Sequence, residues 1–261
     1  MDYSVVDQEA DIQREIELAS PMFSQVLGID ELEREYSTNP NFLRKLPSLH
    51  ASYPHFRRTR GDGNCFYRCV MFSLLEQFIL TSSQLSSQSS STTIYHQVLK
   101  LVKESGSILS AAGFEPICYE DFIDLLVSKL ESVQATSIES LQSDFEDKMI
   151  ADSLVMYSRF LISAYMRLNN EKFEGFTEGY ATVLDYCKSE VEPMDRESEQ
   201  LQVMAVAEAF GVRIKILYLD RSDKDQCTEI EFPVDYSGPD FSIYLLYRPG
   251  HYDLLYPIKK N

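Results

Sequence analysis

The chain is short of basic residues and has no long apolar run. Only 24 lysines and arginines stand against 41 aspartates and glutamates, which gives the 261 residues a formal net charge of −17. Such a surface disfavours nucleic acid and anionic membranes and suits basic partners, although solubility alone also explains an acidic excess. No segment approaches the ~20 apolar residues that span a bilayer, and the first residues show no signal-peptide pattern. We therefore expect a cytoplasmic protein, with the nucleus as a second location, and no membrane partner.

Cysteine is also scarce. Five cysteines are too few and too scattered for a disulfide scaffold, and their odd number leaves at least one thiol free. Cys65 and Cys69 are four residues apart, but no second pair of cysteines or histidines has zinc-ligand spacing. These counts favour a reducing compartment, and we expect neither a metal nor a cofactor. The content of hydrophobic residues, 44%, indicates a folded chain, which we expect to be a monomer.

One short stretch, residues 60–68 (RGDGNCFYR), brings a flexible turn to the start of a strongly apolar segment that runs to Phe78. The pattern predicts a helix buried on most sides, with Cys65 at its N-terminus. Unpaired N–H groups and the helix dipole favour a thiolate there. The glycines let the N–H groups around Gly63 and Asn64 point at one spot, as an oxyanion hole requires. Buried cysteines are usually inert packing, so the turn alone leaves that interpretation open.

The other end of the chain supplies the groups that a nucleophile needs. Residues 241–247 (FSIYLLY) and 251–256 (HYDLLY) flank a Pro-Gly pair, which predicts a β-hairpin. Side chains on a strand alternate between its faces, so His251 and Asp253 project to the same side. An imidazole beside a carboxylate is the base and its orienting group in a cysteine triad. The fold must bring them to Cys65.

Three segments carry a resemblance to a known family: residues 59–68, 190–194 (EVEPM) and 244–253 (YLLYRPGHYD). They are similar to the otubain branch of the ovarian-tumour (OTU) cysteine proteases, and they occur in the same order. The resemblance implies a nucleophile, a general base and an orienting carboxylate, which are Cys65, His251 and Asp253. It places the oxyanion hole at Asp62, Gly63 and Asn64.

The resemblance further implies a deubiquitinase that hydrolyses isopeptide bonds in polyubiquitin. With an aspartate at position 253, the chain resembles the otubain type that prefers the lysine forty-eight linkage, which marks proteins for the proteasome. Ubiquitin, polyubiquitin and ubiquitin-conjugating enzymes are the implied partners. Two other functions stay open: a non-catalytic module that binds and inhibits ubiquitin-charged conjugating enzymes, and a thiol protease for ordinary peptides.

We expect two parts in the chain. Residues 1–20 contain an amphipathic arm with Ile12 and Ile16 along one stripe. The resemblance to otubains implies that this arm helps to hold the proximal ubiquitin. The alternative is that the arm docks on the core of its own chain. Residues 21–261 form the catalytic domain. Within it, the Ser/Gln/Thr-rich residues 81–93 predict a mobile loop.

The expected fold class is α+β, with the papain-like OTU architecture that the resemblance implies. Alternating residues at 212–218 predict a strand beside the C-terminal hairpin, which concentrates the strands in the last fifty residues. We therefore predict a small, mostly antiparallel sheet packed with a larger helical layer. The Cys65 helix should pack on the sheet face that bears His251. Leu27 is assigned to a short helix, and Ser198 to the cap of a later one.

Overall fold

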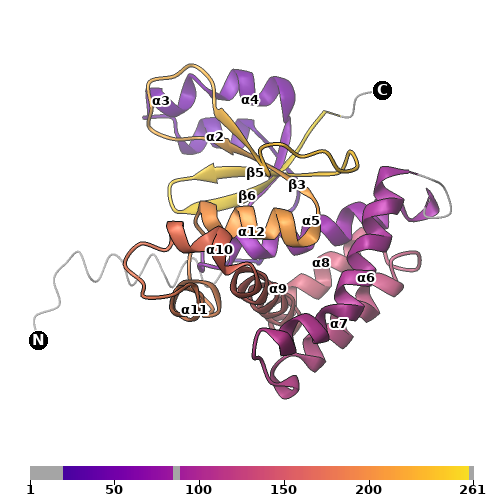
Figure 1. Ribbon diagram of the computed structural model, residues 1–261. Helices are drawn as coiled ribbons and strands as arrows, with labels where there is room; N and C mark the ends of the chain where they lie inside the picture. Colours follow the sequence, from indigo (N-terminus) through magenta and orange to yellow (C-terminus); the bar gives the residue numbers. More distant parts are fainter. Residues whose placement is uncertain (1–19, 85–88, 259–261) are drawn as a thin grey trace, which may run out of the picture.

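The computed structural model describes residues 20–84 and 89–258. The predicted arm, with Ile12 and Ile16, lies outside these residues. A six-stranded sheet stands between a small and a large helical layer (Figure 1), so the predicted α+β class is confirmed. The strands, in sequence order, are β1 (Leu27–Gly28), β2 (His55–Arg57), β3 (Arg213–Tyr218), β4 (Thr228–Phe232), β5 (Ser242–Arg248) and β6 (His251–Tyr256).

The sheet order is β1-β2-β6-β5-β3-β4, and every neighbouring pair is antiparallel except β3 and β5. The predicted hairpin is β5 and β6, in which Arg248 pairs with His251 and Leu246 with Asp253. The strand predicted beside it is β3. The mostly antiparallel sheet is therefore as expected.

Helices account for most of the chain between β2 and β3. The helical elements are α2 (Asp30–Glu35), α3 (Pro40–Leu43), α4 (Leu46–Ser52), α5 (Cys65–Leu80), α6 (Ser90–Ala111), α7 (Glu120–Glu131), α8 (Ile138–Glu146), α9 (Lys148–Leu168), α10 (Asn170–Phe173), α11 (Val183–Tyr186) and α12 (Gln200–Phe210), with short 3₁₀ turns at Ser82–Gln84, Pro116–Cys118 and Glu174–Phe176 and a π-helical turn at Cys187–Val191. None of the helices among the described residues is long and apolar enough for a membrane span.

The sheet is buried on both faces. Leu245 and Leu254 belong to the main core with α5, α9 and α12, whereas Leu246 and Leu255 pack against α2, α3 and α4. Figure 1 shows these three short helices over one face and the larger layer below the other. Burial on both faces explains why residues 241–247 are apolar almost throughout rather than alternating. The second, smaller layer was not predicted.

Helix α5 is the element that positions the candidate nucleophile. Thirteen of its 16 residues are buried, and it packs against β6, the strand of His251. The burial agrees with the prediction, but the sheet face does not. Tyr252 and Leu254 of β6 belong to the core with α5, whereas Leu255, which alternation places on the same side as His251 and Asp253, packs against the smaller helical layer. The helix is apolar on nearly every side because α6, α8, α9 and the sheet surround it.

Three local predictions of helices were wrong, and the strand prediction was incomplete. Four of the six strands lie in the last fifty residues, as predicted, but β1 and β2 extend the sheet beyond β6. Strands of two and three residues are too short to show a periodic pattern. Leu27 accordingly lies in β1, and α2 begins only at Asp30.

The other two corrections concern helix starts. The predicted loop at 81–93 is shorter, because α6 begins at Ser90, where Ser89 caps the helix by accepting the N–H of Thr92 at 3.1 Å. Residues 85–88 lie outside the described chain. Helix α12 is capped by Glu199 rather than Ser198, and the Glu199 N–H donates to the Gln202 side chain at 3.0 Å.

Candidate active site

The loop before α5 is a tight turn that requires a glycine at position 63. Gly63 has φ of +76°, a conformation that favours glycine. A Cβ atom at this position would lie 2.4 Å from the carbonyl carbon of Asp195. The loop therefore touches residue 195 backbone to backbone, which no other residue type permits here.

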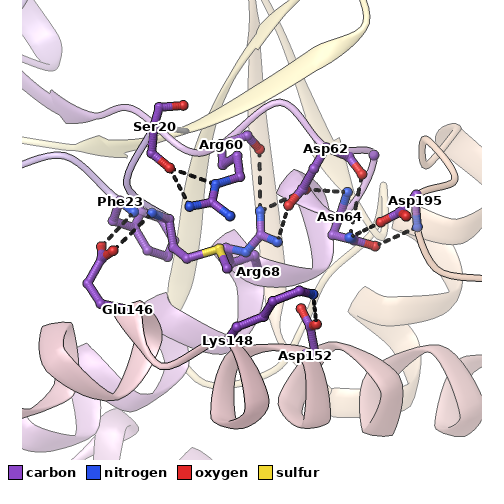
Figure 2. A network of polar contacts seen from close by, with 12 residues as sticks. Ser20, Phe23, Arg60, Asp62, Asn64, Arg68, Glu146, Lys148, Asp152 and Asp195 are labelled. Carbon is purple, nitrogen blue, oxygen red and sulfur yellow. Dashed lines mark hydrogen bonds and ion pairs between the residues drawn. The ribbon is translucent and has the colours of Figure 1, made fainter. Parts of the chain in front are cut away.

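Asp62 ties this loop to the first turns of α5. Its carboxylate accepts two bonds from Arg68, at 2.9 and 2.6 Å, and one from the N–H of Asn64 at 3.1 Å. Burial raises the pKa of Asp62, but the bonds from Arg68 outweigh it and lower the pKa overall. Figure 2 shows Arg68 and Asp62 facing one another beside Asn64.

Asn64 is anchored on its other side. Its Nδ2 donates to the carboxylate of Asp195 at 2.8 Å, and its Oδ1 accepts from the Asp195 N–H at 3.0 Å (Figure 2). The same Oδ1 accepts from Arg159 at 2.9 Å. The side chain of Asn64 and its N–H are thus both engaged within the protein. Asn64 was assigned to the oxyanion hole. Because its N–H donates to Asp62, its role in this structure is to hold the shape of the loop.

Cys65 is the first residue of α5, as predicted, and is only 3% exposed. His251 lies at the start of β6, hydrogen-bonds Asp253, and is close enough to Cys65 for the thiol to raise the pKa of its ring. The distance from Nε2 of His251 to Oδ1 of Asp253 is 2.8 Å. The structure thus brings together the three residues that the sequence predicts, across 186 positions.

The surroundings favour a charged imidazole. Burial lowers the pKa of His251, but hydrogen bonds to Asp253 and Cys65 raise it to about 10. The Asp253 side chain is fully buried, which on its own raises its pKa. The positive charge of Arg248, the His251 bond and the N–H of Thr59 at 2.9 Å outweigh burial and lower the pKa. Asp253 therefore stays ionised beside the imidazolium.

Arg248 is a functional residue that the sequence reasoning missed. Its Nη2 lies 2.6 Å from Oδ2 of Asp253, and its Nη1 donates to Glu35 at 2.7 Å. The signal was present, because residues on either side of a two-residue hairpin turn pair with each other, and Arg248 is opposite His251. No local pattern could have indicated Glu35, which comes from α2, 213 positions away.

Two cavities lie at these residues. A cleft of about 920 Å³ contains Cys65 and is walled by aromatic and acidic side chains: Phe176, Tyr218, Phe232, Tyr247, Tyr252, Glu190, Asp195, Glu197 and Glu199. A second cavity of about 560 Å³ contains His251 together with Arg58, Arg248 and Glu35. No group of three or more metal-ligating side chains occurs in the part of the chain that the structure describes.

Comparison with known proteins decides the family. The model of the peptidase C65 otubain family matches residues 15–257. This chain belongs to the otubain family. It is therefore a deubiquitinating cysteine protease by class, as the resemblance implied.

Relatives span almost the whole chain. Human ubiquitin thioesterase OTUB1 is 37% identical over 98% of this chain and 90% of its own length. The Arabidopsis thaliana ovarian tumor domain-containing deubiquitinating enzyme 1 is 34% identical over 97% of this chain and 87% of its own length. A solved structure of OTUB1 with ubiquitin aldehyde and UBCH5B~Ub has a TM-score of 0.84 at 29% identity, covering 98% of this chain and 97% of that one. A corresponding otubain complex contains UBC13~Ub.

Proposed function

We propose that the protein hydrolyses isopeptide bonds in polyubiquitin, with Cys65 as nucleophile, His251 as general base and acid, and Asp253 as orienting group. The observation that carries the proposal is the position of His251, which bonds a buried, ionised carboxylate and interacts with Cys65, a residue of an aromatic cleft. The family supports the reaction class, and the geometry of these three residues supports their roles.

The chemistry follows from this arrangement. In the resting site His251 already holds the proton of the Cys65 thiol as an imidazolium, and the thiolate attacks the carbonyl carbon at the ubiquitin C-terminus. Backbone amides at Asp62 and Cys65, at the N-terminus of α5, receive the negative charge that develops on the carbonyl oxygen. His251 returns the proton to the leaving lysine amine, which gives a thioester. Water, deprotonated by His251, then hydrolyses the thioester and releases the ubiquitin carboxylate and the free thiol.

Asp253 holds the imidazole in place during both steps. Its Oδ1 accepts from His251, so the ring nitrogen that faces Cys65 is the one that exchanges protons. The ion pair with Arg248 keeps Asp253 ionised although its side chain is fully buried. An ionised Asp253 stabilises the imidazolium through the reaction.

The cleft fits the C-terminal tail of ubiquitin. That tail carries arginines before its two glycines, and the acidic walls attract positive charge. A hydrogen bond from Tyr180 lowers the pKa of Glu190 below its ordinary value, so Glu190 contributes a negative charge. Glu197 and Glu199 add two more carboxylates to the same cleft. Tyr247 and Tyr252 line the same cleft, and we propose that they pack against the two glycines of the tail.

The linkage preference is part of this proposal. Asp253 resembles the residue of the otubain type that prefers the lysine forty-eight linkage. The arm at residues 1–20, with Ile12 and Ile16, is proposed to hold the proximal ubiquitin. The enzyme is further proposed to act as a monomer in the cytoplasm, without nucleic acid.

A second function is favoured by the solved relatives, which hold ubiquitin-charged conjugating enzymes as well as ubiquitin aldehyde. The protein would then also bind a charged conjugating enzyme and inhibit transfer of its ubiquitin. This role does not need the thiol of Cys65, whereas hydrolysis does.

Di-ubiquitins of every linkage test the two functions together. The native enzyme should cleave the lysine forty-eight dimer fastest, and Cys65→Ala should cleave none. The same variant should still slow discharge of a ubiquitin-charged conjugating enzyme if the second function is present. Cleavage that survives in Cys65→Ala would reject the proposed mechanism, and equal rates on all dimers would reject the linkage preference.

A further inference from the structure

A buried arginine on α9 stands behind the loop of the candidate nucleophile. Arg159 is 0% exposed, and its guanidinium lies 4.6 Å from the ring centroid of Tyr67 on α5. Its hydrogen bonds go to carbonyl and amide oxygens rather than to a carboxylate. Burying a charge without an ionic partner is costly. A residue of this kind calls for an explanation beyond packing.

Arg159 joins two segments that are far apart in the sequence. Its Nη2 donates to the carbonyl of Gly63 at 3.0 Å, to Oδ1 of Asn64 at 2.9 Å and to the carbonyl of Arg196 at 2.8 Å. Its Nη1 donates to the carbonyl of Val191 at 3.0 Å. One guanidinium therefore fastens the loop before Cys65 to the segment that forms one wall of the cleft.

The bonds around the peptide unit between Gly63 and Asn64 are the decisive detail. The carbonyl of this planar unit accepts from Arg159, and its N–H, which points the opposite way, donates to Asp62 at 3.1 Å. Asp62 is itself held by two bonds from Arg68. The unit cannot rotate without breaking one side of this clamp.

We infer that Arg159 is a positioning residue for the reaction: it fixes the peptide unit before Cys65, and thereby the backbone amides that stabilise the oxyanion. The inference rests on the proposed function. The next peptide unit along the chain carries the N–H of Cys65, so the orientation of the Gly63–Asn64 unit helps to set where that N–H and the thiol project. Preorganised donors act only if they are held in place before charge develops.

Arg159→Lys tests the inference because lysine keeps the charge but cannot span four acceptors with a planar fork. We expect kcat on ubiquitin carrying a C-terminal fluorophore to fall by a factor of about 10 or more. The loss should be smaller than the roughly 10²–10³-fold loss that follows removal of one oxyanion donor, because the donors are displaced rather than removed. KM should change less than about twofold, because the binding surface is retained. Arg167→Lys is the matched control: it lies on the same helix, over the ring of Phe114, and bonds Glu192 instead of the loop. It should keep kcat.

Affinities separate positioning from a purely structural role. Ubiquitin aldehyde adds to the Cys65 thiol through a new carbon–sulfur bond, and its former carbonyl oxygen, once protonated, lies in the oxyanion hole. Arg159→Lys should weaken binding of ubiquitin aldehyde by the same factor as kcat and leave the affinity for unmodified ubiquitin unchanged. A structural role would weaken both ligands together, which would overturn the inference.

A second pair of variants guards against misfolding of Arg159→Lys. Asp195 is exposed and has φ of 61°, so glycine is tolerated there. Asp195→Gly removes the acceptor of Asn64 and should lower kcat, whereas Asp195→Asn keeps an acceptor and should lower it less. Equal kcat in these two variants, or an unchanged kcat in folded Arg159→Lys, would overturn the inference about Arg159 and leave the proposed function standing. An inactive native enzyme would overturn the proposed function with it.

Discussion

Arg248 offers the sharpest test of how the site is held together. Arg248→Met removes the guanidinium but keeps most of the aliphatic stem, so the fully buried Asp253 loses its ionic partner. Breaking a buried pair by removing one member costs about 3 to 5 kcal/mol, because the remaining charge is uncompensated. The Arg248 side chain is 12% exposed, which places the expected loss of unfolding free energy near the lower end. Denaturant unfolding at pH 7 measures it.

The same variant should change the pH dependence. The pKa of Asp253 is lowered in the native protein, so the stability that this carboxylate contributes is present above its unfolded value and is lost as pH falls through the folded value. Without Arg248 the folded pKa rises, and both the loss of stability and the acid limb of kcat/KM should move to higher pH. A pH series of unfolding and rate measurements gives both shifts.

Two matched variants complete this test. Arg58→Met breaks the other ion pair of Glu35, which is about one-third exposed, and should cost less than about 1 kcal/mol. Arg248→Met combined with Asp253→Asn removes both charges and should regain stability relative to Arg248→Met alone. If Arg248→Met unfolds like the native protein and keeps its pH profile, Arg248 does not hold Asp253 ionised.

Two further predictions concern the loop and the arm. Gly63→Ala adds a methyl group 2.4 Å from the backbone of Asp195 at a φ of +76°. It should therefore lower kcat and cost roughly 1 to 3 kcal/mol of stability, which kinetics and denaturant unfolding measure. Native activity in this variant would reject the tight contact. Deleting residues 1–19 should raise KM for di-ubiquitin, because burying Ile12 and Ile16 contributes roughly 1.5 to 3 kcal/mol each, yet spare ubiquitin with a C-terminal fluorophore, which has no proximal unit; equal effects on both substrates would reject a proximal contact.

The sequence was informative where function depends on local geometry. The glycine turn before Cys65 predicts a thiol at a helix N-terminus, and the i, i+2 spacing predicts that His251 and Asp253 share a strand face. The first relation follows from the change from turn-forming to apolar residues, and the second from the two-residue period of a strand. The structure places Cys65, His251 and Asp253 accordingly. The hairpin register would also have indicated Arg248.

The rest of the site depends on contacts between distant segments. Arg159 lies in an amphipathic helix whose pattern marks only the side that is buried, and nothing in that pattern shows that its partners are Gly63 and Arg196. Glu35 reaches Arg248 from a helix on the opposite face of the sheet. Such partners become visible only when the chain is folded, because neither propensity nor periodicity encodes them.

The central claim is that Cys65 alone attacks the ubiquitin C-terminus. Its most direct test is the mass of the intact protein after reaction with a ubiquitin probe that carries a C-terminal electrophile. The native enzyme and the alanine variants of the other four cysteines, Cys69, Cys118, Cys187 and Cys227, should each gain one ubiquitin, and Cys65→Ala should gain none. A ubiquitin adduct on Cys65→Ala, or its absence from the native enzyme, would contradict the proposed mechanism.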